Sequence, residues 1–98
     1  METVFDKLNT LARQGAIVPI GPVGVFGATC MALADGSAAI RQVRECPAGG
    51  VVWFHWINGW ELISNGRVVA RWVYGPRDID NQTRAYLRAA RWLLLKAV

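Results

Sequence analysis

Apolar residues recur with a helical period near both ends of the chain and alternate with other residues through most of its middle. In the first segment, Val4, Leu8 and Leu11 follow the i, i+4, i+7 spacing that places side chains on one side of a helix. Gly15 follows the last of these repeats, where glycine favours the end of a helix. The pattern predicts a short helix over residues 3–14.

The start of this helix carries a capping signal. Thr3 precedes the first apolar position, and its hydroxyl can accept a hydrogen bond from the backbone of the first turn. Asp6, three residues later, stands where a capping box prefers Glu or Gln, and its charge favours the positive end of the helix dipole. We therefore expect Thr3 to be the N-cap.

Residues 16–27 alternate Ile, Val and Phe with prolines and glycines. Proline has no backbone N–H and is confined within sheets mainly to edge strands, so this segment is expected to be a poor edge strand. The spacing of Gly21, Gly24 and Gly27 matches neither a P-loop nor a dinucleotide-binding fingerprint. The segment therefore predicts no phosphate site.

A second strand pattern surrounds Asp35-Gly36, a dipeptide typical of tight turns between β-strands. The residues before and after it, 28–34 and 38–45, are expected to pair as a hairpin. The Cys-Pro-Ala-Gly-Gly run at 46–50 is expected to be a loop.

The segment from residue 51 to residue 74 holds four of the five tryptophans and two Asn-Gly dipeptides. A two-residue type I′ turn needs φ > 0 at both central positions, which Asn and Gly tolerate best. We expect both dipeptides, at 58–59 and 65–66, to be turns. The three strands of the resulting meander are predicted at about 51–57, 60–64 and 67–74.

Alternation assigns faces to two of these strands. The mostly apolar side of the last strand is expected to hold Val68, Ala70, Trp72 and Tyr74. The mixed side of the same strand holds Arg67, Val69, Arg71 and Val73. The first strand has bulky residues on both sides, so we expect the side with Phe54 and Trp56 to meet a second layer or a partner.

A longer helix is predicted over residues 79–97, with Asp78 or Asp80 near its N-terminus as cap and dipole partner. The apolar period comprises Ile79, Thr83, Tyr86, Ala90, Leu93, Leu94 and Ala97. A stripe of arginines follows another side of the helix: Arg77, Arg84, Arg88 and Arg91. We therefore expect one face of this helix to be buried and another to be basic.

Together these elements predict one α+β domain over residues 1–98. Its expected centre is an antiparallel β-meander of four to five strands, with a short N-terminal helix and a longer C-terminal helix. The hydrophobic share of 53% is slightly above the usual globular value and the charged share of 18% is below it. Some apolar surface is therefore expected to remain for a partner or for a homodimer.

The sequence also bears on compartment. No uninterrupted apolar run approaches the roughly 20 residues that a membrane span requires. The N-terminus carries acidic Glu2 and Asp6 where a signal peptide would be positively charged. We expect a protein without a membrane segment, located in the cytoplasm.

The residues that usually carry catalysis are sparse. His55 is the one histidine of the chain, and no nucleophile motif or carboxylate pair at a readable spacing accompanies it. Cys30 and Cys46 form no CxxC pair, so with His55 they cannot complete a four-ligand zinc site without carboxylates. A disulfide between them would need positions opposite each other on paired strands, and reduced thiols are favoured in the cytosol. We expect no enzyme activity, no metal and no cofactor.

Two binding functions fit the arginines, which number nine against two lysines and contribute to a net charge of +4. Protein binding is favoured, because Trp, Tyr and Arg are the residues most enriched at interface hot spots. Direct nucleic-acid binding is the alternative, with the arginines on phosphates and exposed rings stacking on bases. The rings that could serve are Trp53, Trp56, Trp60 and Trp72. Codon bias in a GC-rich genome would also give many arginines.

A small, arginine-rich α+β chain with a meander between two helices resembles the phage-encoded anti-CRISPR and related anti-defence inhibitors. The resemblance lies in size and architecture and involves no sequence motif. It implies an inhibitor that acts in the cytoplasm of a bacterial host and binds a host protein or nucleoprotein complex, such as a CRISPR-Cas effector. The expected partner-binding residues are Arg67, Arg71, Arg77, Arg84, Arg88, Arg91, Trp56 and Phe54.

Overall fold

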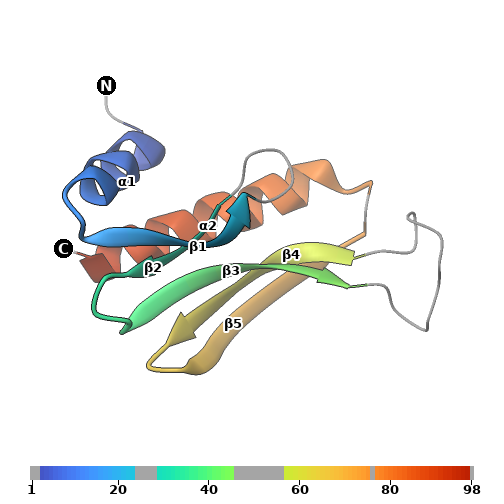
Figure 1. Cartoon of the computed structure of the whole chain (residues 1–98). Coiled ribbons are helices and arrows are strands. Elements are labelled where there is room, and N and C mark those ends of the chain that lie inside the picture. The colour runs from blue at the N-terminus through green and yellow to red at the C-terminus, as the bar shows by residue number, and fades with distance from the viewer. Residues whose placement is uncertain (1–2, 24–28, 46–56, 76, 98) are drawn as a thin grey trace.

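The computed structural model describes residues 3–23, 29–45, 57–75 and 77–97 of the 98-residue chain. Along the chain, one helix precedes five strands and a second helix follows them (Figure 1). In chain order the elements are α1 Val4–Arg13, β1 Ile17–Val23, β2 Thr29–Leu33, β3 Ala38–Glu45, β4 Ile57–Ser64, β5 Arg67–Tyr74 and α2 Ile79–Ala97.

The strands form one sheet in the order β1-β2-β3-β4-β5, and every neighbouring pair is antiparallel. The sheet is therefore a meander, in which each strand pairs with the next one along the chain. β1 lies at one edge, as its prolines predict, and β5 lies at the other. These features confirm the predicted α+β class with a helix at either end of an antiparallel sheet.

The ends of α1 follow the predicted local chemistry. Thr3 Oγ1 accepts the Asp6 N–H at 3.1 Å and Asp6 Oδ2 accepts the Thr3 N–H at 3.0 Å, which completes a capping box. The hydrogen bond that the Thr3 backbone N–H donates to the Asp6 carboxylate lowers the pKa of Asp6. At the other end Gly15 has φ +79°, and the Ala16 N–H donates to the Leu11 carbonyl at 3.0 Å, as in a Schellman motif.

One hydrophobic core lies between the sheet and the helices. α2 crosses one side of the sheet, and α1 lies against α2 and β1 (Figure 1). Ala85 and Ala89, one turn apart on α2, are both buried, and their small side chains allow the helix to approach the strands. The buried apolar residues of this core are Leu8, Ile17, Leu33, Ala38, Ile40, Trp60, Leu62, Ala85, Ala89, Ala90 and Leu93.

Three aromatic rings join the layers of the core. The ring of Tyr86, on α2, stacks on that of Trp60, on β4, with centroids 4.6 Å apart. The Tyr86 ring also contacts the ring of Phe5, on α1, with centroids 5.2 Å apart. Offset aromatic contacts of this kind stabilise beyond the area that they bury, so both helices are tied to the sheet through Tyr86.

The two Asn-Gly dipeptides have different structures. Asn65 and Gly66 have φ of 51° and 81°, which is the predicted type I′ turn between β4 and β5. Asn58 and Gly59 instead lie inside β4, which continues unbroken from Ile57 to Ser64 and pairs along its whole length with β3. The prediction of a turn at 58–59 is therefore wrong. Residues 51–56 of the strand predicted before it lie outside the described residues.

The turn between β2 and β3 is built around Asp35. The Gly36 N–H donates to the Leu33 carbonyl at 2.9 Å, and Gly36 has φ +77°. Asp35 Oδ1 accepts the Ser37 backbone N–H at 2.9 Å and its hydroxyl at 2.7 Å. These bonds lower the pKa of Asp35 and confirm a tight turn at the predicted position.

A β-bulge changes the faces of β5. Leu62 of β4 pairs with Ala70, but the next residue, Ile63, pairs with Val68, so that Val69 is an extra residue in β5. Val68 consequently shares a face with Ile63 and is 50% exposed. Ala70, Trp72 and Tyr74 pack against the core, so the predicted apolar side of β5 is correct for these three residues. The prediction is wrong for Val68.

α2 begins where predicted, with Asp78 at its N-terminus. The Asp78 carboxylate accepts Asn81 Nδ2 at 2.8 Å, and the Asp78 carbonyl accepts the Gln82 N–H at 3.1 Å. The buried side is rotated relative to the prediction, because Thr83 is exposed and Ile79 is 55% exposed. Ala85 and Ala89 take the positions against the sheet.

Candidate functional site

The arginine stripe of α2, defined here as Arg84, Arg88 and Arg91, faces away from the core. All three side chains are exposed, whereas Ala85, Ala89 and Leu93 on the opposite side of the helix are buried. At 1.5 Å per residue the stripe extends over about 10 Å of helix. The period of the sequence therefore correctly predicted a basic face distinct from the buried one.

Leu95 extends this face with an apolar side chain. It lies one turn after Arg91 and is 76% exposed, more than any other large hydrophobic side chain among the described residues. Leu95 is not among the site residues predicted from the sequence. Its i+4 spacing from Arg91 is the signal that could have placed it on the stripe.

Arg88 links the stripe to the sheet. Its guanidinium carbon lies 5.2 Å from the centroid of the Trp72 ring, on β5. Trp72 is half-buried and also packs against the core. A guanidinium over an indole ring is attracted by the ring quadrupole, so Arg88 is held at the β5 side of α2.

The other three predicted arginines lie outside the stripe. Arg77 is exposed in the turn that precedes α2, Arg67 is exposed at the start of β5, and Arg71 is exposed in the middle of β5. Arg71 belongs to the face of β5 that points away from the core. Three of the predicted arginines therefore lie together on α2 and two lie on β5, and Arg88 contacts β5 through Trp72.

A charged row crosses the sheet on the face opposite α2. Glu61 on β4 is 7% exposed and forms an ion pair with Arg41 of β3. The strand register places Arg41 on one side of Glu61 and Arg71 on the other. No pattern in the sequence indicated this row, because the row depends on the pairing of strands whose residues, Arg41 and Glu61, lie twenty positions apart.

The three tryptophans among the described residues are less accessible than nucleic-acid stacking requires. Trp60 is buried in the core, Trp72 lies under Arg88, and Trp92 is half-buried with the Lys96 ammonium 5.7 Å from its ring centroid. The expectation that Trp60 could stack on bases is therefore wrong. Trp53, Trp56 and Phe54 lie outside the described residues, so their predicted roles stay predictions.

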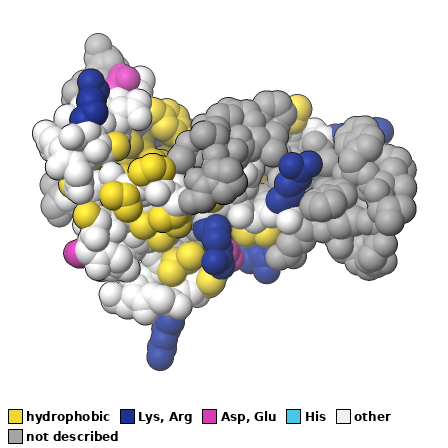
Figure 2. All heavy atoms as spheres, in the orientation of Figure 1, with side chains coloured by type: hydrophobic (Ala, Val, Ile, Leu, Met, Phe, Trp, Pro, Cys, Tyr) yellow, Lys and Arg dark blue, Asp and Glu magenta, His cyan; other side chains and the backbone are white. Residues whose placement is uncertain are grey.

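Basic side chains are dispersed on the face seen in Figure 2. Among the described residues in that view, Lys and Arg stand singly between apolar patches and do not gather into one continuous basic surface. Concentrated positive charge is therefore a property of the helix stripe and not of this face.

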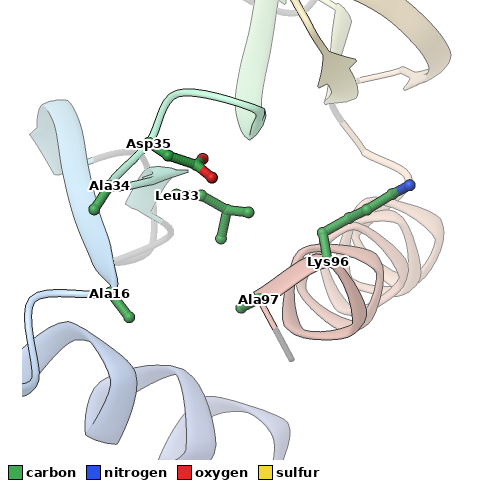
Figure 3. Close-up of a pocket in the computed structure, with 6 residues that line it drawn as sticks. All are labelled: Ala16, Leu33, Ala34, Asp35, Lys96 and Ala97. Carbon is green, nitrogen blue, oxygen red and sulfur yellow. The ribbon is translucent and has the colours of Figure 1, made fainter.

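An open hollow of about 230 Å³ lies where α2 ends beside the β2–β3 turn (Figure 3). Its lining is mainly small and apolar, from Ala16, Leu33, Ala34 and Ala97. Asp35 stands at its rim, but this carboxylate already accepts two hydrogen bonds from Ser37. Lys96 also contributes, although its ammonium end points away from the alanines. The hollow therefore presents few polar groups that could bind a ligand.

The strand register gives the position of Cys30 on β2. Met31 of β2 pairs with Ile40, so Cys30 lies beside the middle of β3, and Cys46 follows the end of that strand. Cys30 Sγ instead accepts the Gln42 backbone N–H at 3.2 Å. Cys46 lies outside the described residues, so a disulfide between it and Cys30 stays a hypothesis from the sequence.

Within the described part of the chain, no three His, Cys, Asp or Glu side chains are grouped so as to hold a metal ion. None of the helices described is both long and apolar enough to cross a membrane.

Comparisons of the chain with protein families, with curated proteins and with solved structures found no match in any of the three. The function must therefore be argued from the residues and their geometry.

Proposed function

We propose that this protein is a non-catalytic binding protein that docks the arginine stripe of α2 on an acidic surface of a partner protein. The observation that carries the proposal is the combination on one helix face of three exposed arginines and an exposed leucine. Its finer form follows the resemblance stated above: a phage or mobile-element inhibitor that binds a host defence nucleoprotein complex in the bacterial cytoplasm.

The chemistry of the stripe suits a protein interface. Arginine binds carboxylates through two parallel hydrogen bonds, and it is enriched at hot spots together with tryptophan and tyrosine. Arg88 is already held over Trp72, so less side-chain freedom is lost when it binds. Leu95 adds apolar contact area beside the charges.

Direct nucleic-acid binding is the second candidate, because the same three guanidinium groups could neutralise phosphates. Two tryptophans near the stripe are covered by cations, Trp72 by Arg88 and Trp92 by Lys96. Bases would have to displace those cations before they could stack on the rings. This arrangement favours a protein partner.

The proposal is tested by affinity purification of partners from bacterial lysates with the tagged protein and with an Arg84→Glu/Arg91→Glu variant. These two residues are chosen because Arg88 contacts the Trp72 ring, whereas no comparable ring contact of Arg84 or Arg91 occurs among the described residues. We expect a stoichiometric partner for the unaltered protein. Reversal of two interface charges should weaken its binding about a hundredfold, or ~2.7 kcal/mol.

The matched control is Lys7→Glu/Arg13→Glu, which makes the same change in net charge on exposed positions of α1. Equal weakening by both variants would point to net charge and contradict a specific stripe. Recovery of no partner from several hosts would count against the binding function. Affinity for DNA or RNA that falls steeply with log salt would favour the nucleic-acid alternative instead.

A further inference from the structure

The arginine stripe and Leu95 form a straight row along α2. At about 100° and 1.5 Å per residue, the four side chains lie within about 60° of one another around the helix axis and extend over about 16 Å. All four are exposed. A row that stays on one side of a helix over several turns is the seam along which a second helix packs.

Leucines border this row on one side. Leu87 lies three residues after Arg84, about 60° around the helix axis, and is half-buried. Leu94 has the same relation to Arg91 and is also half-buried. With Leu95, which is 76% exposed, they give the charged row an apolar margin. A row of phosphates has no apolar group to cover such a margin, whereas an amphipathic helix has.

The positive charges of the stripe are available to a partner. Among the described residues, none of its three guanidinium groups takes part in an ion pair. Arg88 contacts the face of the Trp72 ring, which leaves its charge uncompensated. Asp80, one turn before Arg84, is an exposed acidic residue on the same side of the helix. Three positive charges against one negative charge select an acidic occupant.

The backbone of α2 favours a helical occupant over an extended one. The N–H and C=O groups of a helix bond within it, so a strand that docked on α2 would find no backbone partners there. A second helix satisfies its own backbone. It also presents side chains in a straight row with the same average spacing of 3.5 residues.

We infer that the partner segment that docks on the stripe is an acidic amphipathic α-helix packed along α2. This inference rests on the proposed binding function and names the segment through which the partner is held. The carboxylates of the partner helix lie opposite the three arginines, and its apolar residues cover the three leucines. The charge pairs set the register of the two helices, and the leucines supply apolar burial.

A second copy of α2 fits this role poorly. In an antiparallel pair with Arg88 opposite Arg88, Arg84 of each copy would face Arg91 of the other. In a parallel pair each arginine would face its own counterpart. A shift that brings Asp80 opposite Arg84 moves Arg88 and Arg91 beyond the start of the other helix at Ile79. Like charges therefore oppose a second copy in each arrangement, and an acidic helix has no such conflict.

The test is an NMR titration of the full-length protein with the capped peptide (Leu-Glu-Ala-Ala-Glu-Leu-Ala)3, whose glutamates form one row between leucines when it is helical. We expect shift changes centred on the stripe and Leu95, with β1 unchanged. Replacement of every Glu by Gln should weaken binding at least about tenfold, because the charge pairs are lost. Replacement of one Ala in each heptad by Pro keeps the charges but prevents the helix, and should weaken binding as much.

A variant of the protein checks the apolar margin. Leu95→Ala should weaken binding of the acidic peptide about fivefold, because a large exposed side chain no longer becomes covered. The matched control is Ile79→Ala, on the same helix. Ile79 is 55% exposed but lies about 140° around the axis from Arg84, so its replacement should leave binding unchanged. Equal weakening by both variants would refute the contact with Leu95.

Four outcomes would overturn the inference. The first is an absence of shifts on the stripe with the acidic peptide, and the second is equal affinity for the glutamine or the proline peptide. The third is tighter binding of a short duplex DNA to the same residues, which would mean that the stripe is a phosphate site. The fourth is a change in stripe signals with protein concentration alone, which would mean that a second copy occupies it.

The proposed function fails separately, when the lysates yield no partner. A partner that is lost on Arg84→Glu/Arg91→Glu but is not displaced by saturating acidic peptide would keep the function and refute the inference. Displacement by the acidic peptide, and not by its glutamine form, would support both.

Discussion

Asn58-Gly59 and Asn65-Gly66 have the same two residues, seven positions apart, but opposite roles in the sheet. The second is a turn with positive φ at both residues and open space around Gly66. The first is an extended part of the interior strand β4, with β3 on one side and β5 on the other. A Cβ atom added to Gly59 would lie 1.7 Å from the Trp72 carbonyl oxygen.

The comparison teaches that one dipeptide can serve two physical needs. At Gly66 the absence of a side chain relieves the backbone, because φ of +81° disfavours any L side chain. At Gly59 it provides space for the neighbouring strand. Only the need at Gly66 is local. The turn at Asn65-Gly66 can therefore be recognised from flanking residues, whereas the close approach at Gly59 cannot.

The largest effect is expected from Gly59→Ala. The new methyl group would overlap the backbone of Trp72, and backbone cannot rotate away as a flexible side chain can. We expect a loss of about 3 kcal/mol or more in the free energy of unfolding, measured by urea denaturation.

The control for this substitution is Gly75→Ala. Gly75 has no positive φ, and a Cβ there would meet nothing within 4 Å. Its replacement should be neutral or slightly stabilising. A cost below ~1 kcal/mol at Gly59 would show that β4 and β5 separate easily at this point, and the contrast between the two dipeptides would then disappear.

Gly66→Ala should have a smaller effect. Alanine at a left-handed position costs about 1–2 kcal/mol, and no atom lies close enough to add a steric clash. Urea denaturation of both variants compares two costs in the free energy of unfolding: backbone strain at residue 66 and steric overlap at residue 59. If Gly66→Ala proved the more harmful of the two, the turn would matter more to the sheet than the close approach of its strands.

The smallest effect is a local response to acid. Ser37 lowers the pKa of Asp35 from its ordinary value of 3.8, so the stabilisation is fully present above that pH and is lost as pH falls through the lower native value. The Ser37 carbonyl also accepts the Asn65 N–H at 2.9 Å. NMR titration to about pH 2 should therefore shift the Ser37 and Asn65 amides together. Asn58 should not follow them.

Asp35→Asn provides the control, because it removes the titrating group while keeping a side-chain oxygen. The common shift of Ser37 and Asn65 should vanish in this variant. A shift that persists would have to come from another carboxyl group, and the two turns would then be uncoupled.

Local signals predicted much of the fold. The Thr3 and Asp6 box, the turn at Asp35 and the turn at Asn65 depend on residues a few positions apart, and all three are found where expected. The prediction of a turn at Asn58 was wrong because Gly59 instead allows the close approach of the Trp72 backbone, which is distant in sequence. Likewise, the face of Val68 changed because of a single extra residue in the pairing of β5.

The candidate site divides in the same way. Exposure of Arg84, Arg88 and Arg91 follows from the helical period alone. The position of Arg88 over Trp72 does not, because it depends on how α2 crosses the sheet. The pair between Arg41 and Glu61 depends equally on strand register, so no pattern within either strand could have indicated it.

The contact of α1 with α2 has a consequence for synthesis on the ribosome. The ring of Phe5 packs against that of Tyr86, more than seventy residues later in the chain. Translation proceeds from the N-terminus, so α1 emerges long before α2 is available to cover its apolar side. Until α2 is released, the apolar side chains of Val4–Arg13 lack the helix that packs against them, so the packing of α1 is completed only after translation of Ile79–Ala97.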